Sequence, residues 1–428
     1  MKYTDMPRLQ LKVEKHLVQK AYHKYKAKGL DLNMDRGKPN PSQAETILDM
    51  LDVVNSKSDN YISEEGFDIL NYGCLTGLSE IKTLLSETYD IPDEKIIVGG
   101  NSSLTMMFDY LMQCYAKGAD ENLEPWCKQG DVKFLCVVPG YDRHFSIAEY
   151  LGIKMVNVPM TETGPDIDLV EELVKDPLVK GMFCVPQYSN PTGTTYSDET
   201  VRRLAAMETA PDFRIVWDNA YGIHDLMNKE DRVLDLLSEC EKAGHPERCV
   251  LFASTSKISF PGAGIAFLAA NEPNYSWILD RMQNQAIGND KVNMMRHALY
   301  FKNKDGMMDH MKTLAEIITP RFNIVLDTFE KELGSLGIAE WTNPNGGYFI
   351  SLDVMEGCAT RVYDLARGAG VSLTPVGATF PYGKDPNDEN IRIAPTFPSE
   401  EDLQEATNIL VLCIKLACLE KLLDEKKD

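Results

Sequence analysis

Seven short apolar runs between residues 95 and 268 constrain the fold of this chain more than any other feature. They are residues 95–98, 134–138, 154–158, 181–185, 214–217, 249–252 and 265–268. Each run has four or five residues, and helix-like or turn-rich segments separate most of them. Apolar strands of this kind, alternating with helices, are typical of a mostly parallel sheet that is covered on both faces. We therefore predict an α/β domain over residues 61–304.

The two ends of the chain predict a second, smaller domain. Residues 11–28 and 305–335 have helical patterns, and residues 347–352 and 390–393 resemble short strands. Ser399 precedes the closing apolar-periodic segment in a capping-box pattern, which predicts a final helix. We expect residues 1–60 and 305–428 to form one small α+β domain.

Charge and composition exclude several classes of partner. Lys and Arg total 44 against 65 Asp and Glu, so the net charge of the 428 residues is −21. A chain this acidic repels nucleic-acid phosphates and anionic lipid, so we expect neither nucleic acid nor membrane as a partner. The ten cysteines show no Cys-x-x-Cys spacing, which predicts free thiols and no metal site. With no apolar secretory segment at the start, these features favour a cytoplasmic protein.

Five polar clusters follow apolar runs of the predicted sheet, where ligands bind in open α/β folds. They are residues 99–103, 139–144, 189–193, 217–221 and 254–257. The first cluster, Gly-Gly-Asn-Ser-Ser, precedes a helix-like segment, and such a helix start can hold an anion such as phosphate. Taken alone, it also fits an ordinary turn with a capping serine.

The other clusters supply a ring-binding set of side chains. Tyr141 could stack on a planar ring and His144 could orient a carboxylate, although a surface turn also fits. Asn190 offers an amide, while Asp218 at a strand end needs a cationic partner such as a protonated ring nitrogen, unless it caps a helix. Lys257 stands among hydroxyls, where it could form a Schiff base with an aldehyde.

The segment Ser254–Lys257 also matches the Ser-x-x-Lys motif of penicillin-binding enzymes. That interpretation fails because the Ser-Asp-Asn at residues 58–60 precedes the motif and the chain has no Lys-Thr-Gly. Together, the five clusters provide a phosphate site, a stacking aromatic, an amide, a carboxylate with a phenol, and a lysine. This combination meets the requirements of pyridoxal phosphate, which we predict as the cofactor.

In these motifs the chain resembles the class I/II pyridoxal-phosphate aminotransferases of fold type I over essentially its whole length. The resemblance implies that Lys257 holds the aldehyde, Asp218 the ring nitrogen, and Asn190 and Tyr221 the ring hydroxyl, with Lys257, Asp218 and Tyr221 as the catalytic residues. Tyr141 would stack on the ring, with His144 behind the aspartate. The phosphate would be bound by Ser102, Ser103, Ser254 and Ser256.

The resemblance also implies a homodimer with shared active sites. Tyr72 matches the tyrosine that reaches the phosphate of the neighbouring subunit, and Arg392 matches the arginine that holds the substrate α-carboxylate, near Asn190. Many relatives carry an arginine shortly after the lysine, but no cation occurs in residues 258–266. This departure, with the motifs at residues 35–39, 139–145 and 377–383, resembles the class Ic aspartate aminotransferases of bacteria.

The subgroup resemblance implies transfer of an amino group from an L-amino acid, with aspartate leading, to the 2-oxo acid 2-oxoglutarate. The distal carboxylate of such a substrate needs a cation, and the sequence does not choose among Arg36, Lys38, Lys291 and Arg296. Two alternatives on the same fold stay open: a carbon–sulfur β-lyase and an aminotransferase for another amino acid. A DNA-binding regulator of this fold is disfavoured by the −21 charge and by the roughly 30 residues before residue 35, which are too few for a further domain.

Overall fold

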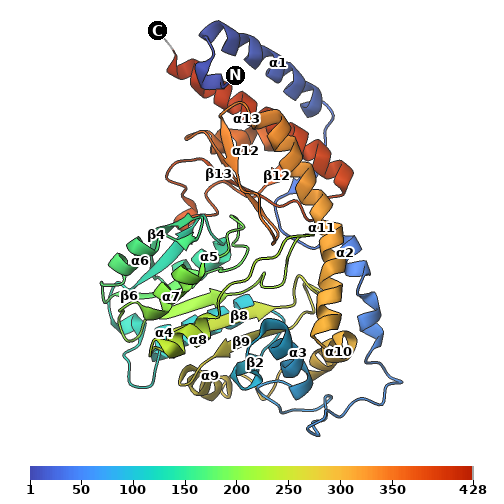
Figure 1. The fold of residues 1–428 in the computed structure, drawn as a ribbon, viewed down its shortest axis with the longest axis vertical. Coiled ribbons are helices and arrows are strands. Elements are labelled where there is room, and N and C mark those ends of the chain that lie inside the picture. Colours follow the sequence, from blue (N-terminus) through green and yellow to red (C-terminus); the bar gives the residue numbers. More distant parts are fainter. Residues whose placement is uncertain (427–428) are drawn as a thin grey trace.

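An eight-stranded sheet forms the centre of the larger domain in the computed structural model, which describes residues 1–426 (Figure 1). The strand order is β2-β9-β8-β7-β6-β3-β4-β5. Strands β3, β4, β6, β7 and β8 run parallel, whereas β9 is antiparallel to both of its neighbours and β5 is antiparallel to β4. The predicted mostly parallel sheet is therefore confirmed. Its strands are β2 (Ile96–Val98), β3 (Lys133–Val138), β4 (Lys154–Thr161), β5 (Gly164–Pro165), β6 (Val179–Cys184), β7 (Arg214–Asp218), β8 (Cys249–Ser254) and β9 (Ala266–Ala270).

Alternate residues of these strands belong to two different apolar cores. On β8, Leu251 packs into the core on one face of the sheet, and Val250 and Phe252 pack into the core on the other. Because side chains alternate across a strand, burial on both faces requires a run of apolar residues without polar interruption. This is the physical reason for the uninterrupted apolar runs in the sequence.

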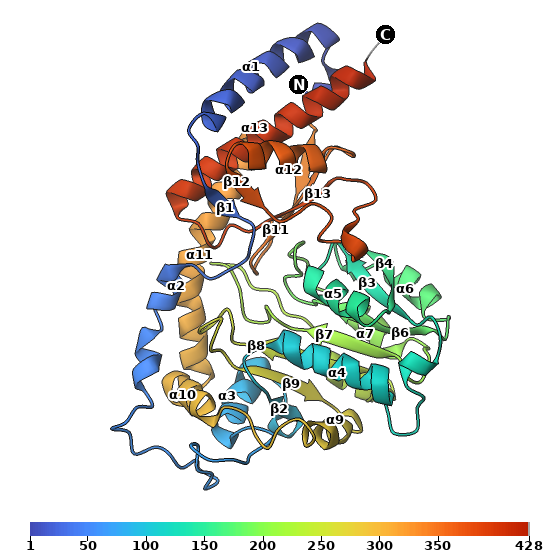
Figure 2. The ribbon, with the colours of Figure 1, turned by 180° about the vertical axis from the view of Figure 1, so that it is seen from behind.

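Helices cover both faces of the large sheet (Figures 1 and 2). One core contains side chains of α4 (Ser103–Lys117), α5 (Asp142–Tyr150) and α9 (Asn274–Met282). The opposite core contains side chains of α3 (Ser79–Tyr89), α6 (Ile167–Leu173), α7 (Asp198–Ala206), α8 (Leu236–Lys242) and α10 (Lys291–Phe301), and of the start of a long helix described below. This layered arrangement leaves the carboxyl ends of the parallel strands open toward the smaller domain.

The smaller domain contains segments from both ends of the chain, as predicted. Strand β1 (Leu32–Met34) pairs in parallel with β12 (Val371–Leu373), and α1 (Arg8–Lys26) packs along α13 (Glu400–Glu425) (Figure 2). The remaining elements are the antiparallel strands β10 (Ala339–Trp341), β11 (Ile350–Val354) and β13 (Asn390–Ile393), and the helices α2 (Pro41–Glu45) and α12 (Ala359–Gly368). Ser399 caps α13, because its hydroxyl accepts a 3.1 Å hydrogen bond from the Asp402 amide.

The boundary between the domains at residue 60 stays a prediction. Ile47, Met50 and Val54 lie in the same core as the helices of the larger domain, so part of the segment 1–60 packs there. The predicted strand at residues 347–352 is shifted, since β11 begins at Ile350. Short 3₁₀ helices occupy Tyr3–Asp5, Leu48–Asp52, Asp93–Lys95, Trp126–Lys128 and Pro381–Gly383.

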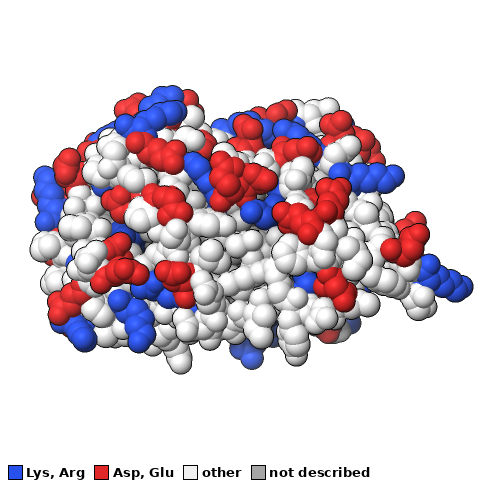
Figure 3. All heavy atoms as spheres, turned by 90° about the horizontal axis from the view of Figure 1, so that it is seen from below, with Lys and Arg blue, Asp and Glu red and all other residues white. Residues whose placement is uncertain are grey.

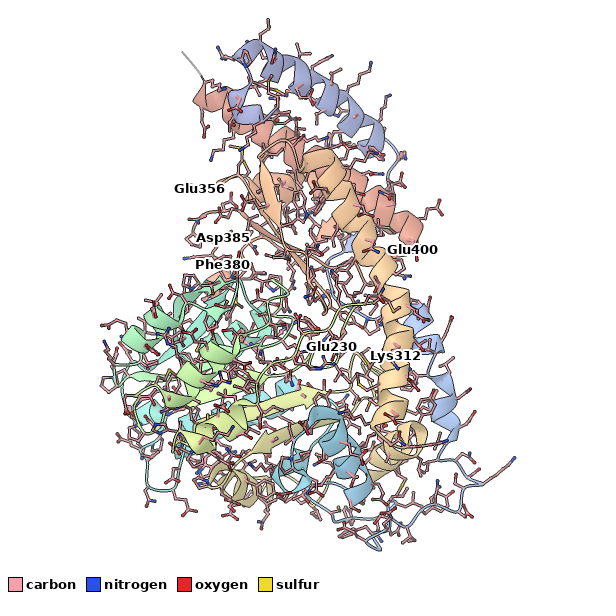
Figure 4. All side chains as sticks on the ribbon, in the orientation of Figure 1. Glu230, Lys312, Glu356, Phe380, Asp385 and Glu400 are labelled. Atoms are coloured by element: carbon pink, nitrogen blue, oxygen red, sulfur yellow. The ribbon has the colours of Figure 1, made fainter. Side chains whose placement is uncertain are left out.

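Two features connect the domains. Helix α11 (Lys304–Leu333) has 30 residues; Met307 near its start packs in the larger domain and Phe329 near its end in the smaller one. The second feature is the loop 374–389, which carries Phe380 and Asp385 to the boundary between the domains (Figure 4).

The loop 374–389 is fixed to the larger domain by specific contacts. The Gly140 amide donates to the Thr379 carbonyl at 2.8 Å, and the Met155 amide donates to the Tyr382 hydroxyl at 3.0 Å. Phe380 packs against the core that contains α4 and α5. The Gly-Ala-Thr-Phe-Pro-Tyr-Gly motif therefore joins the two domains.

Across residues 1–426, none of the helices combines the length and the hydropathy required to cross a bilayer. All ten cysteines are unpaired, and eight of them are buried.

Candidate active site

A cavity of about 660 Å³ lies between the carboxyl ends of the large-domain strands and the smaller domain. Both domains contribute to its lining. The larger domain contributes Ser102, Ser103, Leu104, Met107, Tyr141, Asp142, Arg143, Val185, Asn190, Asp218, Ala220, Tyr221, Ser254, Ser256 and Lys257. The remaining lining residues are Asp35, Arg36, Gly37, Lys38, Phe349, Thr374, Pro375, Ala378 and Arg392.

The sheet order explains why side chains distant in sequence meet in this cavity. Strands β8, β7, β6 and β3 are consecutive neighbours in the sheet. Lys257, Asp218, Asn190 and Tyr141 lie at or just beyond the carboxyl ends of these strands, in the same order. Parallel strands place their carboxyl ends at one edge, so the four side chains converge.

Asp218 is a buried carboxylate with one oxygen satisfied and one free. His144 Nε2 lies 2.9 Å from Asp218 Oδ2, and both side chains are almost fully buried. Oδ1 of Asp218 has no hydrogen-bond partner among residues 1–426. A buried carboxylate oxygen without a partner is costly, so this atom is prepared to accept a hydrogen bond from a cationic ligand.

Lys257 lies over two stacked tyrosines. Its Nζ is 5.1 Å from the ring centre of Tyr221 and 5.8 Å from that of Tyr348. Burial lowers the pKa of Lys257, while the Asp218 carboxylate opposes that shift. A lysine whose pKa is depressed by its surroundings is a stronger candidate nucleophile and proton carrier than a surface lysine.

The serines predicted to bind the phosphate gather at the N-terminus of α4. Ser102 is the capping residue, and its hydroxyl accepts a 3.2 Å hydrogen bond from the Thr105 amide. Ser254 Oγ and Ser256 Oγ are 3.0 Å apart, and Ser256 Oγ also donates to the Asn101 carbonyl at 3.3 Å. Hydroxyls beside the positive end of a helix suit an anion.

Arg392 enters the cavity from β13 of the smaller domain and is held on several sides. Its Nη1 lies 2.9 Å from Asp142 Oδ1 and 3.4 Å from Asn190 Oδ1, and Nε donates to Thr374 Oγ1 at 3.3 Å. The guanidinium also lies 4.9 Å from the ring centre of Phe349. Its plane is thus fixed, as bidentate binding of a carboxylate requires.

Not all predicted residues line the cavity of their own chain. Arg36 and Lys38 do, but Tyr72 and Lys291 line a separate surface hollow together, and Lys291 Nζ donates to the Gly73 carbonyl at 3.1 Å. Arg296 lies on α10, apart from the lining. Within this single chain, Lys291 and Arg296 are therefore not positioned to bind a ligand in the cavity.

Several functional candidates escaped the sequence analysis. For Tyr348 and Phe349 the sequence offered one signal, the pair of glycines that precedes them, because paired glycines can mark a closely packed segment. The structure shows this close packing, since a Cβ at Gly346 would lie 2.3 Å from the Tyr188 ring. Close packing also explains why residue 37 is a glycine, because a Cβ there would lie 2.5 Å from the Phe349 ring. Asp142 and Arg143 stood within a highlighted cluster but received no role.

The cavity fits pyridoxal phosphate by its own chemistry. It offers an anion cradle, an aromatic at Tyr141, a lysine of lowered pKa, and a buried carboxylate oxygen that lacks a partner. Together with the fold, these features define the class of pyridoxal-phosphate-dependent aminotransferases of fold type I.

Comparison with known proteins places the chain more narrowly. The family model described as aspartate amino-transferase matches residues 9–426, so the chain belongs to the aspartate aminotransferase family. It is a transaminase of that family. An aspartate aminotransferase from Corynebacterium glutamicum is 43% identical over 404 residues, which is 94% of this chain and 93% of the relative.

Solved structures agree with this placement. The structure of an aspartate transaminase from Corynebacterium glutamicum matches with a TM-score of 0.96 at 41% identity, covering 99% of both chains. The α-aminoadipate aminotransferase LysN from Thermus thermophilus, complexed with N-(5'-phosphopyridoxyl)-L-leucine, matches with a TM-score of 0.73 at 20% identity, over 94% of this chain and 95% of that one. At that identity the second match supports the fold alone.

Proposed function

We propose that this enzyme transfers the amino group of L-aspartate to 2-oxoglutarate with pyridoxal phosphate as its cofactor. One observation carries the proposal: a single cavity holds Lys257, the unpartnered oxygen of Asp218 and the fixed guanidinium of Arg392. These are the groups that an amino-acid transamination requires at its reacting carbon and at its carboxylate. The names of the relatives supply the choice of aspartate.

The residues of the cavity have distinct roles toward the cofactor. Lys257 Nζ would bond to the aldehyde carbon, Asp218 Oδ1 would accept from the protonated ring nitrogen, and His144 would hold the Asp218 carboxylate in its orientation. Asn190 and Tyr221 would contact the ring hydroxyl, and Tyr141 would lie against the ring. The phosphate would be bound by Ser102, Ser103, Ser254, Ser256 and the N-terminus of α4. When bound, pyridoxal phosphate supplies the electron sink for the charge that develops at the substrate Cα.

The chain itself supplies binding and proton transfer. Arg392 would hold the α-carboxylate in its fixed plane, which orients the Cα–H bond for removal of the proton. Lys257 Nζ would take the Cα proton, and the lowered pKa of Lys257 keeps a larger share of the amine free to act as a base. The rings of Tyr221 and Tyr348, over which Lys257 Nζ lies, limit access of water to the transferring proton from that side.

A second carboxylate on the substrate needs a further cation. Arg36 and Lys38 lie in the cavity wall next to Gly37, which packs against Phe349 beneath Arg392. Arg143 is a third cation in the lining. We propose Arg36 and Lys38 as the main contacts of the distal carboxylate, because both come from the loop that packs beside the α-carboxylate site.

We further propose a homodimer in which each subunit completes the other's site. Tyr72 is 81% exposed, and it shares a surface hollow with Lys291. Large apolar side chains are exposed in the same region, at Leu48, Leu51, Ile62, Phe67, Leu70 and Ile287. Seen from below, the protein shows a broad uncharged area between acidic clusters (Figure 3). Several large apolar side chains exposed to solvent favour an interface with another protein surface. The acidic charge and the ten unpaired cysteines support our further proposal that the protein is cytoplasmic.

The absorption spectrum of the cofactor-loaded protein tests the proposal. L-Aspartate should abolish the visible band of the bound cofactor, and 2-oxoglutarate should restore it. Lys257→Ala should show neither change, whereas retention of transamination by that variant would refute the assignment. A band that ignores aspartate would reject the substrate, and release of pyruvate from a β-substituted amino acid at a comparable rate would favour the β-lyase.

A further inference from the structure

Asp142 brings a carboxylate of the chain itself onto the guanidinium that we propose as the α-carboxylate site. Its Oδ1 lies 2.9 Å from Arg392 Nη1, the shortest of the polar contacts that the structure gives to Arg392. Asp142 is the first residue of α5, and it lines the active-site cavity together with Arg392. Its side chain is 32% exposed, whereas that of Arg392 is 7% exposed. The ion pair is therefore part of the cavity wall.

The three polar contacts of Arg392 differ in charge. Asn190 Oδ1, at 3.4 Å, and Thr374 Oγ1, at 3.3 Å, are neutral acceptors. Asp142 is the anionic one of the three, and a hydrogen bond between charged groups is stronger than one between neutral groups. Asp142 thus offers a negative charge and an acceptor oxygen, which are the two properties that a substrate α-carboxylate also brings to Arg392.

A bound carboxylate would compete with Asp142 for the same donors. Bidentate binding uses two of the three guanidinium nitrogens. Two of the three, Nε and Nη1, already contact Thr374 and Asp142, so at least one of these contacts must be shared or given up. The contact with Asp142 is the least favourable to keep, because two carboxylates on one guanidinium repel each other.

Asp142 has other positive groups nearby if it leaves Arg392. Arg143 Nε lies 4.0 Å from Asp142 Oδ2, on a side chain that is 53% exposed. Asp142 also lies in the first turn of α5, where the helix dipole stabilises a negative charge. Arg392 would keep its two neutral contacts and the Phe349 ring, whose centre is 4.9 Å from the guanidinium. Exchange of one carboxylate for another therefore leaves both charges in favourable surroundings.

We propose that Asp142 is an internal counter-ion of Arg392 that the α-carboxylate of the substrate replaces. This inference rests on the proposed function, because it takes Arg392 as the α-carboxylate site. Each carboxylate ligand must displace Asp142 before its bidentate contact is complete. Asp142 therefore weakens the binding of the amino acid and of the 2-oxo acid alike, and a product that is held less tightly dissociates sooner.

A purely structural brace would have the opposite effect on affinity. If Asp142 only held the guanidinium in place, a change at residue 142 would loosen Arg392 and weaken the binding of carboxylates. Asp142→Asn distinguishes the two roles, because asparagine keeps an acceptor oxygen for Nη1 and removes the competing charge. Tighter binding in this variant is a result that a structural role does not produce.

Isothermal titration calorimetry of the holoenzyme with succinate tests the proposal. Succinate carries two carboxylates and no amino group, so it does not react with the cofactor. We expect Asp142→Asn to bind succinate roughly fivefold more tightly than the wild type, because a neutral hydrogen-bond partner of Arg392 is easier to displace than a charged one. In steady-state transamination, the KM for L-aspartate should fall in the same variant and kcat should not rise.

Glu149→Gln is the matched control. It removes the same charge from an exposed position of α5 that does not line the cavity, so its affinity for succinate should equal that of the wild type. Near-ultraviolet circular dichroism verifies that each variant is folded. Unchanged succinate affinity in Asp142→Asn, an equal gain of affinity in Glu149→Gln, or no binding heat in either the wild type or Asp142→Asn would overturn the proposal.

Arg392→Lys separates this proposal from the proposed function. Weaker succinate binding in Arg392→Lys together with tighter binding in Asp142→Asn supports the counter-ion role. Weaker binding in both variants identifies Asp142 as a brace and overturns that role, while Arg392 keeps its assignment. Succinate binding that is indifferent to Arg392→Lys overturns the carboxylate site and the counter-ion with it. The succinate result decides the role of Asp142 even if the visible band ignores L-aspartate, so the two failures are distinguishable.

Discussion

Replacement of Arg392 by lysine tests the proposed binding of the α-carboxylate most directly. The guanidinium is 7% exposed and is fixed by Asp142, Asn190 and Thr374, so it presents its donors in one plane. Lysine keeps the charge but loses the planar pair of donors. One charge-assisted hydrogen bond contributes about 1.5–3 kcal/mol, so kcat/KM should fall roughly 10- to 150-fold.

The assay is steady-state transamination with L-aspartate and, separately, with a monocarboxylic amino acid. Arg392→Lys should reduce kcat/KM for both substrates by a similar factor, because both carry the α-carboxylate. Arg36→Gln, which removes a cation whose side chain is 64% exposed, should affect only L-aspartate. An Arg392→Lys enzyme within twofold of the wild type, or a loss confined to L-aspartate, would refute the assigned role.

Three further predictions concern buried polar groups. Asp218→Asn should lower kcat at least 100-fold with little change in KM, measured by steady-state kinetics, because the charge acts on the transition state. Lys180→Met should reduce the free energy of unfolding, measured by urea titration, by about 3–5 kcal/mol. The reason is that the Asp212 carboxylate would stay buried without the Lys180 ammonium group, which lies 2.8 Å from it. Burial lowers the pKa of His297 from 6.5 to about 4, so the unfolded state binds the proton first as pH falls. Stability should therefore decline from pH 6.5 to 4, by about 3 kcal/mol from this residue, and His297→Gln should show a flatter decline by chemical denaturation.

The sequence predicted the sheet and the converging clusters because both leave local patterns. Strand β8 is apolar on both faces, and the polar residues that follow it reach the open edge of the sheet. The short strands β1, β10 and β12 were not predicted. Each has three residues, which is too short for a period of two to be recognised.

The parts of the site that were missed depend on contacts between distant segments. Arg392 Nη1 contacts Asp142 Oδ1 although the two residues are 250 positions apart in the sequence, and no local sequence pattern predicts such a contact. Lys291 was one of four candidate cations for the distal carboxylate of a substrate, but the fold turns it toward the Gly73 carbonyl. Charge alone does not reveal which way a side chain faces.

Helix α11 has a consequence for how the protein loses its structure. Its first turns supply Met307 and Met311 to the core of the larger domain, and its later turns supply Phe322 and Phe329 to the other core. Neither core is complete without its share of one continuous helix. Melting of either end of α11 therefore exposes apolar surface in both domains, and heat should unfold them in one cooperative transition. The proposed carboxylate site in the smaller domain and the proposed cofactor site in the larger domain should therefore be lost in the same transition.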